Sequence, residues 1–495
     1  METDRAAPSR SDPAAESSEP LTSAIDDAPV GLDAPVVACS EGGPASPPVG
    51  VERPQHARRR RRRRQIKWSL IVLLVVVVAV AGLVVARRVN RPLAQPVLPA
   101  VSRSSIVVQG TAPALAWPAG GQAAVSIPTL GYGSQSGIET PVPVASLTKM
   151  ATAVVILRDH PVARDTSGPS ITITADDAAQ FGIDLQNDET NIPLQAGETL
   201  TEQQLLEALL NQSANDVAYS LASWDAGSES AFVTKMNSLA ASLGAVNTHF
   251  VDASGFQTQS VSTASDMLRI AAAGMSIPTF ADIAGMPTVS LPLVGTAKNI
   301  VTEVGTDGVV GVKSGYTAQA GGCMVLAGYR TIGGRSVLVL ASVLGQIEPP
   351  PAAPAPPPAP GAAPTTTTST APYSALEAQY PLRYAGPIVE GLLDATKATI
   401  VPVAVAKSGE AVGTATAVWA GVRHSLPAVA SRSAWLLGVP RQRVISYTTP
   451  APDLGTTSKQ VGSAHFTLGT QREVVDLRTT HTLSRPSWWW KALHN

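Results

Sequence analysis

The longest apolar run of the chain lies close to its N-terminus, at residues 68–86, and only Ser69 and Gly82 interrupt it. As a helix this run would be about 28 Å long, which is enough to cross the hydrocarbon core of a bilayer. Seven consecutive arginines, at 58–64, precede the run, whereas only three arginines follow it closely. The pattern predicts a single transmembrane helix at 68–86, an uncleaved signal anchor with its N-terminus in the cytoplasm and the rest of the chain outside. A cleaved signal peptide is the alternative.

Beyond residue 105, apolar residues recur first at helical and then at strand spacing. Thr201 and Gln204 form a capping box that would begin one of the helices, and a Gly-Gly turn at 333–334 would join two strands as a hairpin. A helical middle followed by an antiparallel meander predicts an α+β domain rather than a doubly wound one. The expected helices are 144–158, 201–210, 215–222 and 228–243, and the expected strands are 123–127, 309–313, 322–329 and 335–344.

Residues 348–372 consist almost entirely of Pro, Ala and Thr, a composition typical of an extended spacer rather than of a core. A helix is expected at 383–396 after this insert. Short alternating strands then follow, separated by turn residues, which predicts a small C-terminal β domain. Three tryptophans at 488–490 end that domain and would either lie at a membrane interface or pack on the strands. The expected strands are 400–406, 411–419, 443–448, 464–468 and 473–479.

Composition narrows the classes of function that the chain could have. The 495 residues carry a net charge of −1, which argues against a general nucleic-acid binder. The arginines at 58–64 abut the predicted span, so we expect them to bind anionic lipid rather than nucleic acid. The two cysteines, Cys39 and Cys323, would lie on opposite sides of the membrane and exclude a disulfide scaffold. The seven histidines are scattered without metal-ligand spacing, so no metal or other cofactor is expected.

Ser146 and Lys149 begin the helix expected at 144–158. Residues three apart share one face of a helix, so the hydroxyl and the amine would lie within reach of each other. A lysine that is partly desolvated there can lose its proton and act as the base that activates the serine. A helix cap beside a surface lysine is the simpler interpretation of a lone motif, although only Lys149, of nine lysines, follows a serine by three residues.

Two further motifs are equally ambiguous when each is taken alone. Ser213 and Asn215 lie at the break between two predicted helices, where they could relay a proton and bind a substrate amide, or simply cap a helix. Lys313 and Gly315 end a predicted strand, where the lysine could bind a substrate carboxylate and the glycine would allow a close approach. The same triplet recurs at Lys407, between two strands of the β domain, where an ordinary turn is expected.

The three motifs lie 67 and 100 residues apart, in the order S-x-x-K, S-x-N and K-[TS]-G of the serine penicillin-recognising enzymes. With these residues the chain resembles the D-alanyl-D-alanine carboxypeptidases, the low-molecular-mass penicillin-binding proteins of peptidase family S11. The resemblance covers about 105–347 and 373–400. It implies a penicillin-recognising serine transpeptidase/β-lactamase-like fold, an antiparallel sheet with a helical subdomain. Further matching stretches are 145–150, 210–216, 236–244, 254–256 and 262–266.

The resemblance implies a catalytic role for three residues. Ser146 would attack the peptide bond between two D-alanines of a peptidoglycan stem pentapeptide and become acylated. Lys149 would be its general base, and Ser213 would relay a proton to the leaving amine with the help of Lys313. The backbone N–H groups of Ser146 and Tyr316 would form the oxyanion hole. Water would then release the shortened peptide, without a metal or an organic cofactor, and β-lactam antibiotics would acylate the same serine.

Other residues of the motifs would bind substrate in such an enzyme. Asn215 would hold the amide on the acyl side, while Lys313 and the hydroxyl of Ser314 would face the terminal carboxylate. Gly315 and Tyr316 would complete the strand edge along which the substrate lies. Thr is commoner in the family where Ser314 stands here, and because the hydroxyl is retained we expect tuned rather than abolished activity.

Two rival functions stay open at this point. Residues 207–211 mimic the E-x-x-L-N loop of class A β-lactamases, but they precede the S-x-N triplet, whereas the glutamate loop of that class follows it. A catalytically weak member of the family could instead bind peptidoglycan as a scaffold, for which the long tail and the Pro-rich insert would suit partner docking. The sequence does not distinguish trimming of a stem peptide from cleavage of cross-links or peptide transfer.

The resemblance implies a bacterial enzyme, and the apolar run with its flanking arginines predicts a single-pass membrane protein whose catalytic domain lies outside the cytoplasm. Its expected segments are a disordered acidic tail at 1–57, an Arg-rich juxtamembrane segment at 58–67, the anchor at 68–86, a linker at 87–104, the serine D,D-peptidase domain at 105–347, the insert at 348–372, a closing helix of the peptidase domain at 373–400 and the C-terminal β domain at 401–495.

Overall fold

The computed structural model describes residues 56–92, 97–98, 106–112, 114–292, 294–347, 373–419, 422–451, 459–481 and 486–494. The predicted acidic tail up to residue 55 and the Pro-rich insert at 348–372 lie outside the described residues.

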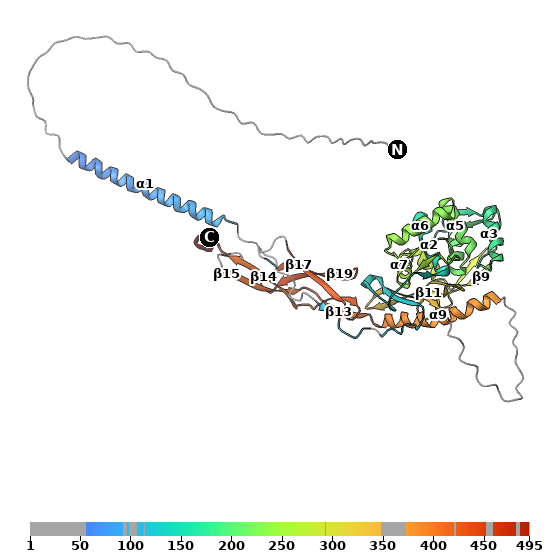
Figure 1. Ribbon diagram of the computed structural model, residues 1–495. Helices are drawn as coiled ribbons and strands as arrows, with labels where there is room; N and C mark the ends of the chain where they lie inside the picture. The colour runs from blue at the N-terminus through green and yellow to red at the C-terminus, as the bar shows by residue number, and fades with distance from the viewer. Residues whose placement is uncertain are drawn as a thin grey trace, which may run out of the picture. The chain divides into compact units, whose positions relative to one another are not determined.

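Helix α1 (His56–Val89) contains the long apolar run (Figure 1). Its most apolar window has a mean hydropathy of 3.2, and the side chains of that window are all exposed. Such a surface is suited to lipid rather than to water. By length and composition α1 is therefore a candidate membrane span, as predicted, while its orientation stays a prediction.

A five-stranded antiparallel sheet with the strand order β10-β11-β12-β2-β3 forms the centre of the α+β domain. Its strands are β2 (Gln122–Ile127), β3 (Tyr132–Gln135), β10 (Val309–Thr317), β11 (Gly321–Ile332) and β12 (Arg335–Gln346). Side chains alternate between the two faces of the sheet, because a strand has a period of two residues. On β11, Val325 and Ala327 pack into one core, and Met324 and Leu326 into another. Both faces of the sheet are therefore covered, and the hairpin predicted at 333–334 joins β11 to β12.

A layer of helices covers one face of this sheet (Figure 1). Its members are α2 (Thr148–Asp159), α3 (Ala175–Gln186), α4 (Glu202–Glu207), α5 (Asn215–Ala226), α6 (Glu229–Ser242), α7 (Ala264–Met275) and α8 (Pro278–Ala284). All residues from 148 to 157 are buried, so α2 is a core helix that neighbours surround on every side. Lys149, the lysine of the first motif, is the second residue of α2, and the packing of the whole layer therefore fixes its position.

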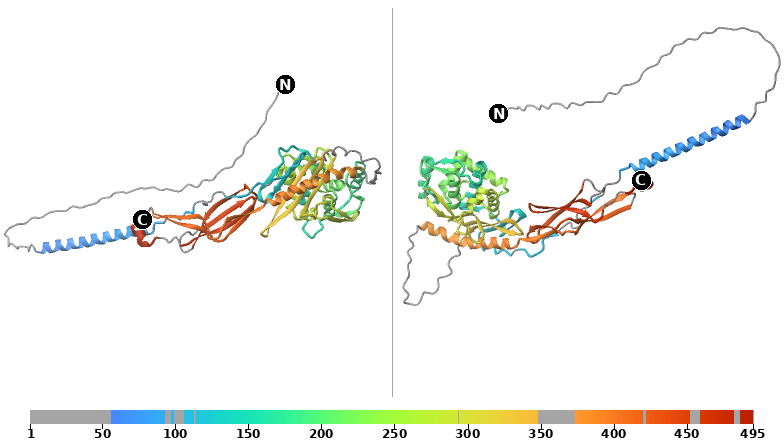
Figure 2. Two further views of the ribbon diagram at one scale, coloured as in Figure 1. Left: turned by 90° about the horizontal axis from the view of Figure 1, so that it is seen from below. Right: turned by 180° about the vertical axis from the view of Figure 1, so that it is seen from behind.

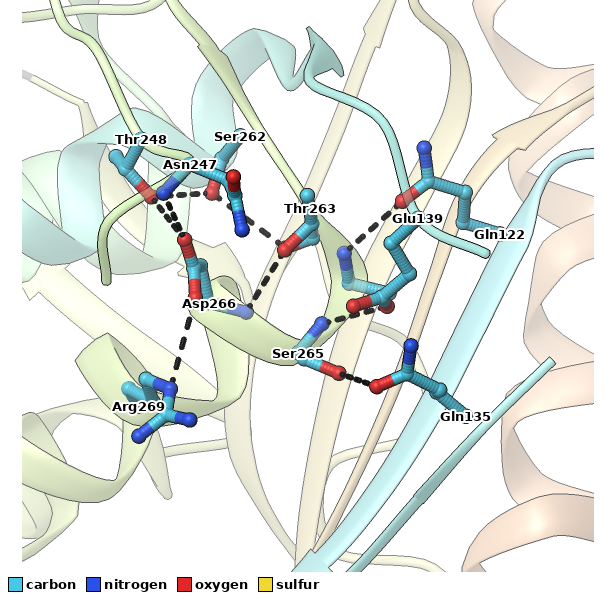
Figure 3. A network of polar contacts seen from close by, with 11 residues as sticks. Gln122, Gln135, Glu139, Asn247, Thr248, Ser262, Thr263, Ser265, Asp266 and Arg269 are labelled. Carbon is cyan, nitrogen blue, oxygen red and sulfur yellow. Dashed lines mark hydrogen bonds and ion pairs between the residues drawn. The ribbon is translucent and has the colours of Figure 1, made fainter. Parts of the chain in front are cut away.

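The start of α7 ties the helical layer to the sheet (Figure 3). Thr263 accepts a hydrogen bond from the backbone N–H of Asp266 at 3.2 Å and so caps the helix. Asp266 in turn accepts from the backbone N–H of Asn247 at 2.7 Å. Glu139 accepts from the backbone N–H of Ser265 at 2.9 Å, which satisfies another of the free donors at the helix N-terminus. No helix was predicted here, although the Thr-x-x-Asp spacing is a helix-start signal.

Helix α9 (Tyr373–Ala398) covers the opposite face of the sheet, against β11 and β12 (Figure 1). Val389 and Leu393 of α9 pack with Leu326 and other residues of that face in one apolar cluster. The helix is longer than the 383–396 predicted from spacing and occupies most of the 373–400 segment expected as a closing helix. It runs through Pro381 and Pro387, which on sequence grounds would end or interrupt a helix. Burial against the sheet therefore outweighs the local cost of the prolines.

The C-terminal β domain contains a six-stranded sheet with the order β1-β17-β18-β19-β15-β14 and a pair of strands, β13 and β16 (Figure 2). The short strand β1 (Ile106–Val107) lies within the predicted bounds 105–347 of the peptidase domain but pairs with β17 of the β domain. Strands β15 and β16 were not predicted, because polar residues and a proline interrupt the alternation of β15. The remaining bounds are β13 (Val401–Ala406), β14 (Ala411–Trp419), β15 (Val422–Ala430), β16 (Ala434–Gly438), β17 (Arg443–Pro450), β18 (Gln460–Leu468) and β19 (Gln471–Thr479).

Outside the larger sheets, the structure has short pairs of strands and a short helix near the end of the chain. These are β4 (Val142–Pro143) with β7 (Val261–Ser262), β5 (Ser170–Thr172) with β6 (Thr199–Thr201), β8 (Thr288–Leu291) with β9 (Gly295–Lys298), and the terminal helix α10 (Trp488–His494). Within α10, the rings of Trp488 and Trp489 stack on each other with centroids 3.9 Å apart, and both side chains are exposed. A place at a membrane interface stays a prediction for these two residues.

The buried carboxyl group of Glu202 makes the stability of the fold dependent on pH. Glu202 is fully buried at the first position of α4, and neither carboxyl oxygen has a hydrogen-bond partner among the described residues. Burial raises the pKa of Glu202 to about 7. The folded chain therefore holds the Glu202 proton more tightly than the unfolded chain does. This contribution to the unfolding free energy is fully present below about pH 4.5 and is lost as the pH rises through about 7. Over this pH range the unfolding free energy should fall by up to about 3 kcal/mol.

We expect Glu202→Gln to remove this part of the pH dependence. Unfolding free energies from denaturant titrations at pH 5 and pH 8 measure it, and the variant should lose less stability between the two than the wild type does. Asp176→Asn, an exposed change in the first turn of α3, is the control. The same loss of stability in the wild type and in Glu202→Gln would contradict the expectation.

Candidate active site

Ser146 lies in a single 3₁₀ turn, Ala145–Leu147, that leads directly into α2. The turn is entered through Ala145, whose φ of 48° is in the left-handed region. Ser146 Oγ lies 3.1 Å from Lys149 Nζ, so the structure brings together the hydroxyl and the amine of the S-x-x-K motif. The 3₁₀ turn was predicted as part of the helix, and the tighter winding leaves the serine at the edge of the cleft described below.

Lys149 is fully buried and makes polar contacts on three sides. Its Nζ donates to the carbonyl oxygen of Ser254 at 2.8 Å and to Asn215 Oδ1, in addition to the contact with Ser146. Burial lowers the pKa of Lys149 to about 8, although the carboxylates of Asp252 and Glu189 oppose that shift. A substantial fraction of this lysine is therefore neutral near physiological pH, which is the form that can accept a proton.

Ser213 and Asn215 are placed by an irregular turn. Helix α4 continues into a π-helical turn, Ala208–Gln212, which ends at Ser213 with a φ of 62°. Asn215 then begins α5, and its backbone N–H donates to the carbonyl oxygen of Thr190 at 2.7 Å. π-turns hold one residue more than an α-turn and are frequent at functional sites. The break was expected from the sequence, whereas its π-helical form was not.

Strand β10 carries the third motif along the other side of the cleft. Lys313 is fully buried and donates to the carbonyl oxygen of Ser314 at 2.8 Å. Burial and the neighbouring charge of Lys149 hold the pKa of Lys313 well below its usual range. Ser314 Oγ is buried without a hydrogen-bond partner in the part of the chain described. A Cβ at Gly315 would lie 2.7 Å from the backbone nitrogen of Ser146, so only glycine lets β10 lie this close to the serine turn.

A cleft of about 630 Å³ joins these elements. Ser146, Asn215 and Tyr316 lie along it together with the loop 187–190 and Phe256. Ser213 and Lys313 are buried beside the motif residues that line it. All three predicted motifs therefore meet at one site, whereas Lys407 of the repeated triplet forms a turn in the β domain. Among the described residues, no cluster of His, Cys, Asp or Glu is suited to a metal ion.

Two groups at this site were not recognised from the sequence as parts of it. Asp252 is fully buried and accepts hydrogen bonds from Ser254 Oγ and from the backbone N–H of Phe256, both at 2.8 Å. It therefore fixes the segment whose carbonyl holds Lys149. Glu189 accepts from Asn215 Nδ2 at 2.5 Å. Residues 254–256 matched the family pattern, which was a usable signal for this segment, but Glu189 lies in a polar loop without any pattern.

Gly255 supports the serine turn through a backbone contact. Its φ is +80°, and a Cβ at this position would lie 1.9 Å from the carbonyl oxygen of Ala145. Gly255→Ala should therefore displace the turn that carries Ser146, lower the unfolding free energy by about 2 kcal/mol and slow acylation of the serine by about tenfold or more. Thermal unfolding and the rate of β-lactam acylation measure the two effects.

Gly227→Ala is the matched control for Gly255→Ala. Gly227 also has a positive φ, +75°, but no atom lies within 4 Å of the position that its Cβ would occupy. The control should lose stability from backbone strain alone and keep its rate of acylation. Equal rates in the two variants would show that the contact with Ala145 has no effect on the serine.

Comparison with known proteins shows the family to which the chain is similar. The family profile described as D-alanyl-D-alanine carboxypeptidase matches residues 134–345. D-alanyl-D-alanine carboxypeptidase DacB2 of Mycobacterium tuberculosis is 34% identical over 213 residues, which cover 42% of this chain and 68% of the relative. A D-alanyl-D-alanine endopeptidase of Pseudomonas aeruginosa is 30% identical over 193 residues, 37% of this chain and 59% of the relative.

A solved structure is similar over a larger part of the chain. The crystal structure of a peptidoglycan synthesis regulatory factor (PBP3) from Streptococcus pneumoniae aligns with a TM-score of 0.50 and 20% identity, and covers 73% of this chain and 98% of that one. At this level of identity the likeness concerns the fold, an α+β domain followed by a β region, as predicted.

Proposed function

Because the chain belongs to the D-alanyl-D-alanine carboxypeptidase family, peptidase family S11, and is a serine peptidase, we propose that it removes the terminal D-alanine from peptidoglycan stem pentapeptides through an acyl-enzyme on Ser146. One observation carries this proposal. Ser146 Oγ lies 3.1 Å from Nζ of the buried Lys149, whose pKa of about 8 makes it a base near neutral pH.

The contacts of Lys149 support a role as general base. A neutral lysine amine has two N–H bonds and one lone pair. If the two N–H bonds are donated to Asn215 Oδ1 and to the carbonyl oxygen of Ser254, the lone pair faces Ser146 Oγ. The amine can then take the hydroxyl proton as the serine oxygen attacks the carbonyl carbon of the penultimate D-alanine.

The remaining motif residues would complete the reaction as follows. The backbone N–H groups of Ser146 and Tyr316 would stabilise the negative charge that develops on the carbonyl oxygen. The proton taken by Lys149 would pass through Ser213, near Lys313, to the nitrogen of the departing D-alanine. A water molecule would then attack the ester carbon, and the serine oxygen would leave with a proton. No step requires a metal or an organic cofactor.

The substrate would lie between β10 and the loop 187–190. The buried hydroxyl of Ser314, which has no partner among the described residues, and the amine of the buried Lys313 would bind the terminal carboxylate. Asn215 would bind the amide on the acyl side, and Gly315 would leave room beside the serine turn. A β-lactam presents the same carboxylate and amide beside a strained ring, so we expect penicillin to acylate Ser146.

We further propose that α1 anchors the enzyme as a single span. The arginines at 58–64 would lie on the cytoplasmic side near anionic lipid, and the catalytic domain would lie outside the cytoplasm. The segments proposed from the sequence would then place the α+β domain and the C-terminal β domain on the side of the membrane where peptidoglycan lies.

The rival functions gain less support from the site. Glu207 of the stretch that mimics a β-lactamase loop is buried in α4 and accepts a hydrogen bond from Gln203. It does not line the cleft with Ser146, so it has no access to an acyl-enzyme there. A scaffold without activity would not need the complete set of buried polar contacts around Lys149. Cleavage of cross-links is a second candidate function, favoured by the relatives named endopeptidases.

The test is release of D-alanine from a pentapeptide that ends in D-Ala-D-Ala, by the full-length chain in detergent. We expect release, and slow turnover of a bound penicillin. No release, or rapid hydrolysis of penicillin, would defeat the carboxypeptidase proposal. The same assay with cross-linked muropeptides separates trimming from cross-link cleavage, because only an endopeptidase would resolve the dimers.

A further inference from the structure

The loop between α3 and β6 brings the carboxylate of Glu189 to the active-site cleft. The backbone N–H of Glu189 donates to the carbonyl oxygen of Asp184 at 2.8 Å. Asn187 Nδ2 donates to Glu189 Oε1 at 3.2 Å. The next residue, Thr190, accepts the backbone N–H of Asn215. The loop is therefore joined to the end of α3 and to the start of α5, and the carboxylate of Glu189 has a fixed place.

Asn215 lies between two opposite charges. Its Oδ1 accepts from Lys149 Nζ, and its Nδ2 donates to Glu189 Oε2 at 2.5 Å. An amide can bridge a cation and an anion in one orientation only, because its oxygen accepts and its nitrogen donates. Glu189 and Lys149 thus determine the side-chain orientation of Asn215, and one N–H of Nδ2 stays available for a substrate.

The negative charge of Glu189 also acts electrostatically on Lys149. The pKa of the neighbouring buried Lys313 is lowered by burial and by the charge of Lys149, and burial is the main cause that lowers the pKa of Lys149 itself. The carboxylate of Glu189 opposes this effect and raises the pKa of Lys149. Removing the negative charge while keeping the side-chain volume should therefore make Lys149 lose its proton at lower pH.

The other titratable groups around Lys149 are held differently. Asp252 binds the hydroxyl groups of Ser254 and Ser260 and fixes the segment behind Lys149. Burial raises the pKa of Asp184 to about 6 and that of Asp216 to about 7, so each of these carboxyls is partly or largely protonated below neutrality. Burial also raises the pKa values of Tyr219 and Glu229. None of these groups is hydrogen-bonded to the Asn215 side chain in the described part of the chain.

We propose that Glu189 is a positioning residue for the reaction on Ser146: through its hydrogen bond to Asn215 it orients the substrate-binding amide and holds a negative charge beside the contact between Asn215 and Lys149. The inference rests on the proposed function, since it concerns the same serine, lysine and asparagine. It assigns a task to a residue that belongs to none of the three motifs.

The test is the pH dependence of acylation by benzylpenicillin, measured with the full-length chain as the second-order rate constant. Glu189→Gln keeps a carbonyl oxygen that can accept from Asn215 Nδ2 and removes the charge. The pH at which the rate is half-maximal should fall by about one unit in this variant. Glu189→Ala also removes the acceptor, and we expect its rate at the optimum to fall by about tenfold, whereas Glu189→Asp should restore part of it.

Asp176→Asn is the control for net charge, because Asp176 is exposed in the first turn of α3 and does not line the cleft. Its profile should coincide with that of the wild type. A Glu189→Gln profile that coincides with the wild type, or an equal shift in Asp176→Asn, would overturn the inference. A wild type that is not acylated at any pH would instead refute the proposed function, so the two failures are distinguishable.

Steady-state release of D-alanine separates positioning from a general loss of structure. If Glu189 orients Asn215 toward the substrate amide, Glu189→Ala should raise KM as well as lower kcat, while Glu189→Gln should move mainly the pH profile of kcat/KM. Thermal unfolding of each variant provides the reference. A loss of activity that follows only the loss of stability, with an unchanged pH profile, would assign Glu189 a structural role and contradict the proposal.

Discussion

Ser146→Ala should abolish both D-alanine release and penicillin acylation, with a loss of at least about 10³-fold in kcat. The hydroxyl is the only group of Ser146 that can form the ester, and alanine retains the backbone N–H that would belong to the oxyanion hole. Ser146 lies in a 3₁₀ turn, and the backbone at Gly255 and at Gly315 packs closely against this turn. We therefore expect the variant to fold normally and to bind substrate without turning it over.

Ser408→Ala is a matched control for this result. Ser408 belongs to the Lys407-Ser-Gly409 triplet in the β domain, which repeats the third motif by chance at a turn. Its replacement should leave the rate of D-alanine release within about twofold of that of the wild type. Measurable release by Ser146→Ala at an undiminished rate would show that another residue is the nucleophile.

Lys149→Arg should reduce acylation by about 10³-fold, although it retains a positive charge. A guanidinium stays protonated throughout the accessible pH range, so it cannot accept the hydroxyl proton of Ser146. In the wild type, the acylation rate should rise with pH and level off above about 8, because burial lowers the pKa of Lys149 to that value and the neutral amine is the active form. The variant should lack this rise.

Stopped-flow measurement of penicillin acylation between pH 6 and pH 9.5 tests this expectation. Lys407→Arg, the same exchange in the repeated triplet, should give the wild-type profile. A variant Lys149→Arg with normal acylation, or a wild type whose rate does not change with pH over this range, would contradict the assignment of Lys149 as the base.

The motif residues could be predicted because the three motifs, each ambiguous when taken alone, occur together in the order and at the spacing of a known family. Ser146 and Lys149 meet across one helical turn, and a glycine such as Gly315 is expected where a strand approaches a reactive group. The antiparallel hairpin of β11 and β12 follows from alternation and a Gly-Gly turn. These signals lie within a few residues of one another, and the tertiary structure leaves them unchanged.

The remaining features depend on contacts between distant parts of the chain. Helix α9 passes through two prolines because its apolar face packs on the sheet, which no local pattern indicates. Strand β1 pairs with β17 across more than three hundred residues. Asp252 and Glu189 reach the site through irregular segments between helices and strands. Their tasks follow from hydrogen bonds that exist only in the folded chain.

The most direct test of the central claim is a rapid-quench experiment with a pentapeptide that ends in D-Ala-D-Ala. D-alanine release is measured together with the mass of the peptide that contains Ser146. The account predicts a stoichiometric, transient tetrapeptidyl ester on Ser146 that forms as the first D-alanine is released and decays by hydrolysis. D-alanine release without any adduct on Ser146, or an adduct on another residue, would contradict it.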